Sequence, residues 1–393
     1  MKIFYLANIR LPTEKAHGLQ IMQNCEAFQE VGAGVTLYVA WRVNTPELAA
    51  VRDVYAHYGV RPSFGVRRIA SLDLFPFLER LSPRLAGVAF GIQVVTYTIA
   101  LFLTMLFRRA EVYYSRDMLT LLSLSLIKPR ARLVYEAHQR SKGRIGRRIQ
   151  GWCVRRVGLT AAVTGRLAND LRAMGAKKVI TAPDGYRMER FADLPAQPAA
   201  RAQLGIARDL FLVGYVGRLH TMHMGKGVDD LIDAAAACER PIGLCLVGGP
   251  DDMAAALQRR WVAAGLPPER FLAAGHVAAE RVPLYIAAFD ACAMPFPFTE
   301  HFAYYASPLK LFEYMAAGKP IVASDLPSTG EIVRHDEGAL LYPPADVTAL
   351  AAALRRLHDD PVLRTRLGKK VGVDAAQYTW AARARMILAA ITG

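Results

Sequence analysis

SPLKLFEYMAAGKPIVASD, residues 307–325, reads as a short helix followed by a buried strand. Ser307 is the expected N-cap, and Pro308 suits the first helical position, where its missing N–H costs nothing. Gly318 supplies the left-handed residue that ends many helices, and the apolar run 321–323 is typical of a strand. The stretch therefore predicts a helix–turn–strand unit, which is the repeating unit of an α/β fold.

The start of that helix offers groups that bind anions. Pro308, Leu309 and Lys310 form its first turn, where free backbone amides and the positive end of the helix dipole favour negative charge. Lys310 adds a cation, and the carboxylate of Glu313 can accept two hydrogen bonds from a vicinal diol. A phosphate site beside a diol acceptor indicates a nucleoside diphosphate with Glu313 on its ribose. The alternative is an ordinary capped helix whose Glu313 faces solvent.

Apolar runs alternate with helix-period segments through the whole chain, which predicts parallel sheets with helices on both faces. The expected strands of the first half are residues 3–7, 35–39, 66–69, 112–114, 133–135, 161–163 and 179–181. Those of the second half are residues 210–216, 243–247, 271–273, 291–294, 321–323 and 339–342.

A chain of 393 residues exceeds the size at which one hydrophobic core keeps growing, so two domains are expected. The Pro- and Ala-rich stretch 194–200 is the expected linker. It separates an N-terminal domain, residues 1–195, from a C-terminal domain, residues 196–375, and residues 376–393 form a helix that crosses back to the first domain. Two doubly wound domains would face each other across a cleft at the carboxyl ends of their strands, where ligands bind.

The net charge of +15 lies entirely in the first half of the chain. Residues 1–196 hold 29 Lys and Arg against 14 Asp and Glu, whereas the remaining residues hold 20 of each kind. The densest part, residues 140–156, has seven basic residues and no acidic one. An anionic membrane or a phosphorylated lipid fits such a surface, and a solvated basic face is the alternative. Nucleic acid is not an expected partner, because no zinc finger, helix-turn-helix or RNP-like pattern accompanies the charge.

Residues 86–107 carry no charge and are long enough to span a bilayer. The stretch contains several polar side chains and lies between two α/β units that must stay on one side of a membrane, so a spanning helix is disfavoured. Two interpretations stay open, a helix buried in the core and a helix that partly faces a membrane.

Five cysteines, scattered without a Cys-x-x-Cys or Cys/His cluster, indicate reduced thiols rather than disulfides or a zinc site. The chain begins with a strand-like segment and shows no signal-peptide pattern. The expected location is the cytoplasm, with peripheral attachment to the inner face of the membrane if residues 86–107 face it.

Candidate binding residues of the second half follow expected strands. Arg218 and Lys226 flank a loop after the strand at 210–216, and two cations there suit a diphosphate, whose negative charge increases as it leaves. Gly248 and Val277 follow the next two strands. Solvated side chains are the alternative for the two cations, and the Gly-Gly and Gly-His-Val motifs are weak signals when taken alone.

Candidate residues of the first half also follow strands. Gly18, at the start of the first helix, lets backbone approach a phosphate or sugar closely. Lys15 and His17 precede it, either as acceptor contacts or as part of a plain surface loop. His138 follows the fifth expected strand and can bind sugar hydroxyls or move a proton near neutral pH. Arg116 follows the fourth and is a further acceptor-side candidate.

These motifs together resemble the family-4 glycosyltransferases, and the resemblance covers nearly the whole chain and is strongest from Arg218 onward. It implies the GT-B fold, in which two Rossmann-like domains face a central cleft and a C-terminal helix crosses back to the first domain. It implies that Arg218 and Lys226 act on the donor diphosphate, that Glu313 holds the ribose and that His138 is the catalytic histidine. The further donor contacts that it implies are Gly18, Gly248, Val277, Ser307, Pro308, Leu309 and Lys310. In one departure, Tyr305 stands where the family often has the first Glu of a Glu-x7-Glu motif.

The activity that this resemblance implies is retaining transfer of a hexose-type sugar from a nucleoside-diphosphate sugar, such as a UDP-sugar, to a hydroxyl acceptor. The expected acceptor is lipid-linked or a cell-surface polysaccharide. No cofactor is expected beyond the donor, and no metal, because no Asp-x-Asp motif appears and cations with a helix dipole can replace Mg²⁺. A nucleotide-sugar epimerase on the same fold and a non-catalytic nucleotide-sugar or membrane-binding protein are the alternatives.

Overall fold

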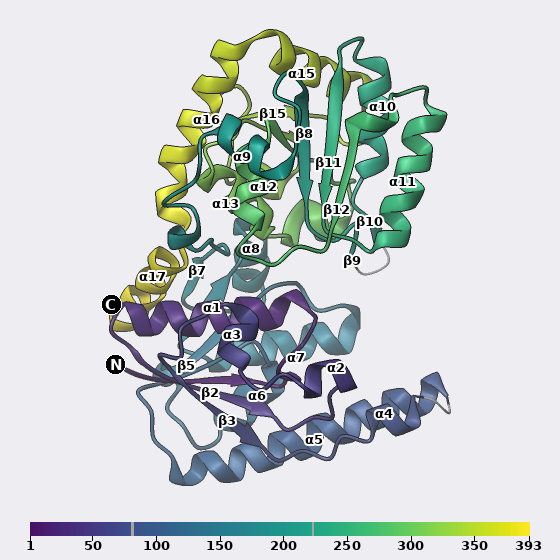
Figure 1. The fold of residues 1–393 in the computed structure, drawn as a ribbon. Coiled ribbons are helices and arrows are strands. Elements are labelled where there is room, and N and C mark those ends of the chain that lie inside the picture. The colour runs from purple at the N-terminus through teal and green to yellow at the C-terminus, as the bar shows by residue number, and fades with distance from the viewer. Residues whose placement is uncertain (80–81, 222–223) are drawn as a thin grey trace. The chain divides into compact units, whose positions relative to one another are not determined.

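The computed structural model describes residues 1–79, 82–221 and 224–393, and the chain divides into two compact units (Figure 1). The N-terminal unit comprises Met1–Asp184 together with Trp380–Gly393, and the C-terminal unit comprises Gly185–Thr379. Each unit has its own parallel sheet covered by helices, as the alternating sequence pattern predicts.

The N-terminal unit is built on a seven-stranded sheet in the order β3-β2-β1-β4-β5-β6-β7. All seven expected strands are present: β1 (Lys2–Ala7), β2 (Gly34–Ala40), β3 (Gly65–Ile69), β4 (Val112–Ser115), β5 (Leu133–Ala137), β6 (Leu159–Ala162) and β7 (Val179–Thr181). The strand order reverses between β1 and β4, and such a switch point is where doubly wound sheets bind ligands.

Helices cover both faces of this sheet. They are α1 (Ala16–Glu30), α2 (Pro46–Ala49), α3 (Val54–Tyr58), α4 (Phe75–Leu78), α5 (Pro83–Phe107), α6 (Met118–Leu124), α7 (Gly143–Arg156), α8 (Gly165–Ala173) and α17 (Trp380–Thr392), with a 3-10 turn, η1 (Arg130–Arg132). Helix α5 packs on α6 and α6 packs on α7, so these three form one layer. The C-terminal helix α17 packs on α1, which joins it to the N-terminal unit.

The C-terminal unit has a six-stranded sheet in the order β12-β11-β8-β13-β14-β15, which reverses between β8 and β13. The six expected strands are present: β8 (Phe211–Val216), β11 (Ile242–Val247), β12 (Phe271–Gly275), β13 (Ala291–Met294), β14 (Ile321–Ser324) and β15 (Ala339–Tyr342). A small antiparallel hairpin of β9 (His220–Thr221) and β10 (Met224–Gly225) was not expected from the sequence.

Two hydrophobic clusters pack on the two faces of this sheet, and the side chains of β8 alternate between them. Leu212 and Val216 lie in one cluster, whereas Val213 and Tyr215 lie in the other. The helices that contribute to the clusters are α9 (Gln197–Leu204), α10 (Val228–Ala237), α11 (Asp251–Ala263), α12 (Val282–Ala288), α13 (Leu309–Ala316), α15 (Val347–Asp359) and α16 (Pro361–Ala375). The short helix α14 (Pro327–Gly330) follows β14. Short turns complete the unit: η2 (Met188–Arg190), η3 (Pro268–Arg270), the π-helical η4 (His301–Tyr305) and η5 (Ala376–Tyr378).

The boundary between the units falls after Asp184, earlier than the expected boundary at residue 195. The reason is a pairing between the entry and exit segments of the C-terminal unit. Tyr186 forms a parallel bridge with Thr379, and its N–H donates to the carbonyl of Tyr378 at 3.1 Å. The final crossing therefore occurs at Trp380, and residues 376–379 stay in the C-terminal unit rather than joining the last helix.

The Pro- and Ala-rich stretch at 194–200 is not a linker, and that prediction is wrong. Its second half begins α9, which packs on α12. The buried guanidinium of Arg201 pairs with Asp290 at 2.5 Å and holds the helix against the sheet. Proline in a first turn and alanine inside a helix favour helix formation, so this composition fits both structures until a packing partner is known.

Helix α13 has the expected C-terminus but a different N-terminus. Gly318 has a φ of +60°, and the N–H of Lys319 donates to the carbonyl of Tyr314 at 3.2 Å, as in a Schellman motif. Pro308, not Ser307, occupies the N-cap position, and no side chain caps the helix. The extended backbone of Pro308 (φ −77°, ψ 118°) starts the helix one residue later than predicted.

The uncharged stretch 86–107 lies within one continuous helix, α5, whose N-cap Ser82 accepts a hydrogen bond from the N–H of Arg84. By length and composition alone this helix could cross a membrane. Only 22% of its most apolar 18-residue window is buried in the protein. The interpretation of this stretch as a helix buried in the core is therefore wrong.

Gly214, in the middle of β8, is required by packing, because a Cβ atom there would lie 1.9 Å from Cδ2 of Phe289. We predict that Gly214→Ala lowers the free energy of unfolding by about 1–3 kcal/mol, since overpacking displaces buried neighbours. Urea denaturation measures the change. Gly34→Ala in β2 is the matched control, because a Cβ atom there would meet nothing within 4 Å. Equal losses in both variants would contradict the packing argument.

Candidate functional site

In the C-terminal unit, glycines join the carboxyl ends of β8, β11 and β12. The N–H of Gly217 donates to the carbonyl of Val247 at 2.7 Å, and the N–H of Gly248 donates to Gly275 at 2.7 Å. Gly248 has a φ of +123°, and a Cβ atom on it would lie 2.5 Å from the carbonyl oxygen of Gly217. This close approach requires glycine, and it forms one edge of backbone at the β8/β13 switch point.

The hairpin of β9 and β10 returns Lys226 to the neighbourhood of Arg218. The N–H of Lys226 donates to the carbonyl of Leu219 at 3.2 Å, directly after Arg218. Burial, together with the like charge of Arg218, lowers the pKa of Lys226 to about 8. The structure thus brings together the two cations that the sequence assigned to a diphosphate.

Lys310, in the first turn of α13, is a third cation at this edge. Its Nζ lies 3.5 Å from the ring centroid of Tyr215 and 5.4 Å from that of Phe296, and a Cβ atom on Gly217 would lie 3.5 Å from it. Burial and repulsion by Lys226 lower the pKa of Lys310 well below its usual range. Within the described residues its buried Nζ has no hydrogen-bond acceptor. The aromatic faces compensate only part of the cost of burying this charge.

Glu313 lies one turn further along α13. Burial raises the pKa of its carboxyl to about 7, although Arg190 and Lys310 oppose the shift. Arg190 closes the turn η2 and also lies 3.8 Å from Glu280. Sequence analysis did not single out Arg190. The available indication was that Arg190 lies in a segment whose aromatic residues, such as Tyr186, pack on the core of this unit.

The remaining predicted donor residues lie around the same elements. Leu309 and Lys310 open α13, so their backbone amides have no acceptor within the helix. Val277 follows β12 and packs, partly buried, on the core. Tyr305 is buried in η4, the π-helical turn that precedes α13. That turn places an aromatic ring where the resemblance would place a carboxylate.

In the N-terminal unit, the fully buried carboxylate of Glu136 at the end of β5 is a hub of hydrogen bonds. Its partners come from five separate elements or segments: Tyr5 Oη (3.2 Å), Asn24 Nδ2 (3.1 Å), Arg116 Nη2 (2.8 Å), His138 Nε2 (2.7 Å) and Arg383 Nη2 (2.9 Å). Burial alone would raise the pKa of Glu136, but Arg116 and Arg383 hold it well below its usual range. The group is therefore an ionised carboxylate that neutralises two buried guanidinium groups.

This hub positions the predicted acceptor-side residues. One ring nitrogen of His138 is held by Glu136, and Arg116 also donates to Gln20 at 3.1 Å. Burial and the charges of Arg116 and Lys15 lower the pKa of His17 to about 4, so His17 is neutral at physiological pH. His17, Arg116 and His138 interact electrostatically and lie together, whereas Lys15 is exposed at the start of α1.

Gly18 has a packing reason of its own. A Cβ atom there would lie 2.5 Å from both Thr13 Cγ2 and the hydroxyl of Tyr58. That hydroxyl donates to the carbonyl of Thr13 at 3.0 Å and accepts from its N–H at 2.7 Å. Glycine is therefore required here because any side chain would displace Tyr58. Contact between Gly18 and the donor stays a prediction.

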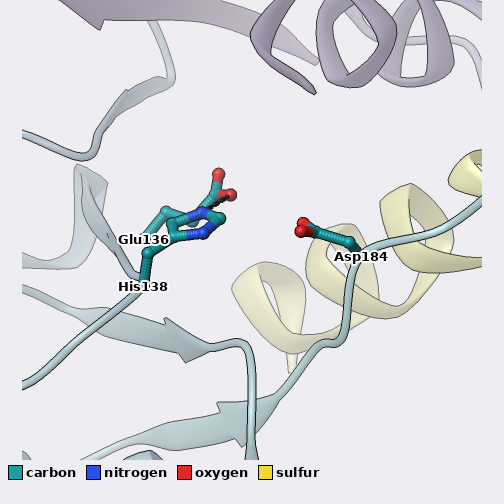
Figure 2. A group of neighbouring side chains, drawn as sticks. All are labelled: Glu136, His138 and Asp184. Carbon is teal, nitrogen blue, oxygen red and sulfur yellow. Dashed lines mark hydrogen bonds and ion pairs between the residues drawn. The ribbon is translucent and has the colours of Figure 1, made fainter. Parts of the chain in front are cut away.

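Glu136, His138 and Asp184 form the one group in the described part of the chain whose donor atoms could hold a metal ion (Figure 2). Their potential ligand atoms lie within 4.8 Å of one another, and Asp184 faces the other two side chains. Arg116 and Arg383 already pair with the Glu136 carboxylate. A metal cation would have to displace or tolerate these two charges, so the residues fit a hydrogen-bonded ion network better than a metal centre.

Sequence analysis did not single out Glu136. A glutamate inside an otherwise apolar strand was the available signal, because a buried carboxylate requires partners. Arg383 and Asn24 gave no comparable signal, since each lies in a helix far from β5 in the sequence.

Residues 211–360 match a family model described as glycosyl transferases group 1. This match confirms the resemblance for residues 211–360, at the level of group 1. One curated relative is a D-inositol 3-phosphate glycosyltransferase of Kineococcus radiotolerans, which is 29% identical over 56% of this chain and 52% of that protein. Another is the lipopolysaccharide core biosynthesis glycosyltransferase LpsD of Rhizobium meliloti, which is 32% identical over 52% of this chain and 54% of that protein. The chain spans about half the length of the curated relatives that it matches.

Solved structures match over the whole chain and confirm the GT-B fold. HepE of Anabaena in complex with UDP has a TM-score of 0.71 and 19% identity, with all of both chains covered. A sucrose-phosphate synthase of Thermosynechococcus elongatus has a TM-score of 0.70 and 20% identity, with 99% of this chain and 98% of that chain covered.

We predict that Glu136→Gln lowers the free energy of unfolding by about 3–5 kcal/mol at pH 7, because Arg116 and Arg383 would lose the carboxylate that pairs with both. Urea denaturation measures the loss, and Glu79→Gln, an exposed glutamate of the same unit, is the control. The pKa of Glu136 is lowered from its usual 4.5, so its contribution is present above that pH and is lost as the pH falls through the folded-state pKa. The two stability curves should therefore converge in acid. A constant difference at every pH would contradict the ion-pair explanation.

Proposed function

We propose that this protein is a glycosyltransferase that moves a hexose-type sugar from a nucleoside-diphosphate sugar to a hydroxyl group. One observation carries the proposal. Arg218, Lys226 and Lys310 gather at the carboxyl edge of β8, and burial with mutual repulsion depresses the pKa of both lysines. Such an excess of positive charge is costly until an anion binds, and a diphosphate supplies that anion. The group 1 match and the UDP bound by HepE support a nucleotide-sugar donor.

The same edge provides contacts for the rest of a nucleotide. The first-turn amides of α13, beginning at Leu309, would bind phosphate oxygens together with the cations. Glu313 would accept the two ribose hydroxyls, and the backbone after β11 and β12, at Gly248 and Val277, would lie against the base. The donor sugar would then extend toward the turn that contains Tyr305.

The transfer breaks the bond between the anomeric carbon of the sugar and the phosphate oxygen, and forms a bond from that carbon to the acceptor oxygen. The hydroxyl proton passes to the leaving diphosphate. Arg218, Lys226 and Lys310 stabilise the charge that develops there, which is the role that Mg²⁺ has in other transferases. We assign retention of configuration to the reaction, with attack from the face of the leaving group, because the resemblance to family-4 glycosyltransferases implies it.

Acceptor binding is assigned to the N-terminal unit. His138 orients donor and acceptor, and Arg116, His17 and Lys15 contact the acceptor. A lipid-linked sugar or a surface polysaccharide is the proposed acceptor class. LpsD, which acts in lipopolysaccharide core biosynthesis, supports this class.

A thermal-shift screen of UDP-, GDP- and ADP-sugars tests the donor site, with EDTA present throughout. We predict that one nucleotide sugar stabilises the wild-type protein and that Glu313→Ala binds it about 10- to 100-fold more weakly, since hydrogen bonds to a charged group contribute about 1.5–3 kcal/mol. Glu337→Ala, an exposed glutamate of the same unit, is the matched control. The donor site is assigned wrongly if no nucleotide sugar binds, or if both variants respond alike.

The same donor separates the alternative functions. A transferase releases nucleoside diphosphate only when an acceptor extract is present, whereas an epimerase converts the donor without one. A non-catalytic binding protein shows the thermal shift but no turnover with any membrane or polysaccharide extract. Loss of turnover on EDTA treatment, restored by Mg²⁺, would contradict metal independence.

We predict that affinity for the donor has a maximum between about pH 7 and pH 8. Hydroxyl donors favour the ionised form of Glu313, whose pKa is about 7, so affinity should rise through that pH. The ammonium of Lys226, whose pKa is about 8, should be lost above that pH, so affinity should then fall. Calorimetric titration with the intact nucleotide sugar measures both limbs. Glu313→Gln should remove the rising limb, and Lys226→Arg should weaken the falling one, to which Lys310 also contributes. Persistence of both limbs unchanged in both variants would contradict the assignment.

A further inference from the structure

Helix α5 buries polar side chains within its inward stripe, whereas its most exposed side chains are apolar. The buried stripe follows an i, i+4 spacing and includes Gln93 and Tyr97; its members are Ala89, Gln93, Tyr97, Leu101 and Met105. Gln93 Nε2 donates to Asn8 Oδ1 at 2.8 Å and to Ser71 Oγ at 3.3 Å, so the polar stripe is held inward by specific partners. In a water-exposed helix the polar face would normally point outward.

The outward face of α5 is a continuous apolar surface about 37 Å long. Its side chains recur at helical spacing and are each 40–58% exposed: Leu85, Val88, Val95, Ile99, Leu103 and Leu106. The helix contains one charged residue, Arg84, at its first turn, and Arg108 and Arg109 follow its end. Apolar patches of this length on a protein surface mark interaction sites.

The next helices of the same layer expose further apolar side chains and add positive charge. Helix α6 packs on α5, and α7 packs on α6. Ile145 and Trp152 of α7 are 75% and 55% exposed, and the guanidinium of Arg156 lies 5.2 Å from the Trp152 ring centroid. Exposed aromatic and aliphatic side chains among arginines are typical of helices that lie in a membrane interface.

Two open hollows beside these helices are lined by arginines. One, of about 480 Å³, is lined by Arg144, Arg147, Arg148, Gly151, Arg155 and Met174 on α7 and at the end of α8. The other, of about 380 Å³, lies between α5 and the edge strand β3 and is lined by Tyr38, Arg67, Arg68, Ile69, Ala70, Ala100, Thr104 and Arg108. No acidic residue lines either hollow, so both suit phosphate groups.

We infer that the layer α5–α6–α7 is a docking surface for a bilayer that contains anionic phospholipids. The outward side chains of α5 enter the acyl boundary, and the arginines of the two hollows receive lipid phosphates. The helix lies in the plane of the membrane and does not cross it, because Gln93, Asn8 and Ser71 bind it to the N-terminal unit.

Charge favours a membrane over a second copy of the chain. The N-terminal unit has 29 basic and 12 acidic residues, a net charge of +17, whereas the C-terminal unit has 20 and 22, a net charge of −2. Two copies that met through α5 would bring equal positive charges together, with arginines on both sides of the contact. An anionic bilayer satisfies the apolar stripe and the arginines at once.

Co-sedimentation of the full chain with vesicles tests the inference. We expect binding to vesicles of equal parts phosphatidylcholine and phosphatidylglycerol, little binding to phosphatidylcholine alone, and weaker binding at high salt. Brominated lipids should quench Trp152 fluorescence, and Trp152→Phe should remove most of that quenching. Sedimentation velocity without vesicles should show one species, and its mass should be unchanged when Val95, Ile99 and Leu103 of α5 are all replaced by Ser.

Matched variants separate the apolar and the basic contributions. Arg144→Gln with Arg148→Gln should weaken partition about 30-fold, because each basic residue near an anionic surface contributes about 1 kcal/mol. The exposed arginines Arg208 and Arg259 of the C-terminal unit, changed in the same way, should have no effect. Val95→Ser, Ile99→Ser and Leu103→Ser combined should reduce binding at least about 10-fold, and the exposed valines Val262, Val362 and Val373, changed to Ser, are the control.

The inference is overturned if vesicles do not bind the wild-type chain, or if the α5 and control variants bind them equally. It is also overturned if the wild-type chain is a dimer that the triple serine variant converts to a monomer, since α5 would then be a subunit interface. Circular dichroism and thermal melting show whether each variant is folded. The donor thermal shift is read from the C-terminal unit, so a failure of membrane binding is distinguishable from a failure of the proposed transferase activity.

Discussion

A buried carboxylate at the end of β5, Glu136, holds the N-terminal unit together. It accepts hydrogen bonds from β1, α1, the end of β4 and the C-terminal helix α17, and from His138 on the loop that follows β5. Burying two guanidinium groups and one carboxylate is tolerated only when they pair with one another, because burying any one of these charges unpaired costs free energy. The same interactions that join α17 to this unit therefore fix the position of Arg116 and one ring nitrogen of His138. The packing of this unit and the positions of the residues that we propose bind the acceptor therefore depend on one ionised group.

In the C-terminal unit and in the outer helix layer, by contrast, charges and apolar side chains lack compensating partners within the described part of the chain. At the edge of β8 the positive charges of Arg218, Lys226 and Lys310 repel one another, and burial lowers the pKa of both lysines. On α5 an apolar surface faces outward while amide and hydroxyl groups face inward. Both arrangements cost free energy in the isolated protein, and a bound molecule would offset that cost. A diphosphate suits the first and an anionic bilayer suits the second.

Much of the fold follows from the sequence pattern. All thirteen strands of the two sheets were expected, because a fully buried parallel strand requires a continuous apolar run bounded by turns. Residues 194–200 and Ser307 were interpreted wrongly, since Pro- and Ala-rich segments suit linkers and helices alike and a cap depends on where the backbone turns. Arg218 and Lys226 were singled out from their place after a strand, and Lys310 from its place in the first turn of a helix. Arg190 and Arg383 were missed, because their roles depend on partners remote in the sequence.

The sequence by itself determined the alternation of strands and helices, the excess of positive charge in the first half and the start of α13, which we propose binds a diphosphate. These are local properties, set by side-chain periodicity, composition and backbone preference. Only the tertiary structure decided which way α5 faces, that the hairpin returns Lys226 to Arg218, and that Glu136 is shared by two arginines and a histidine. Those features depend on free energies of burial and charge pairing, which exist only when residues distant in the chain exclude water from one another.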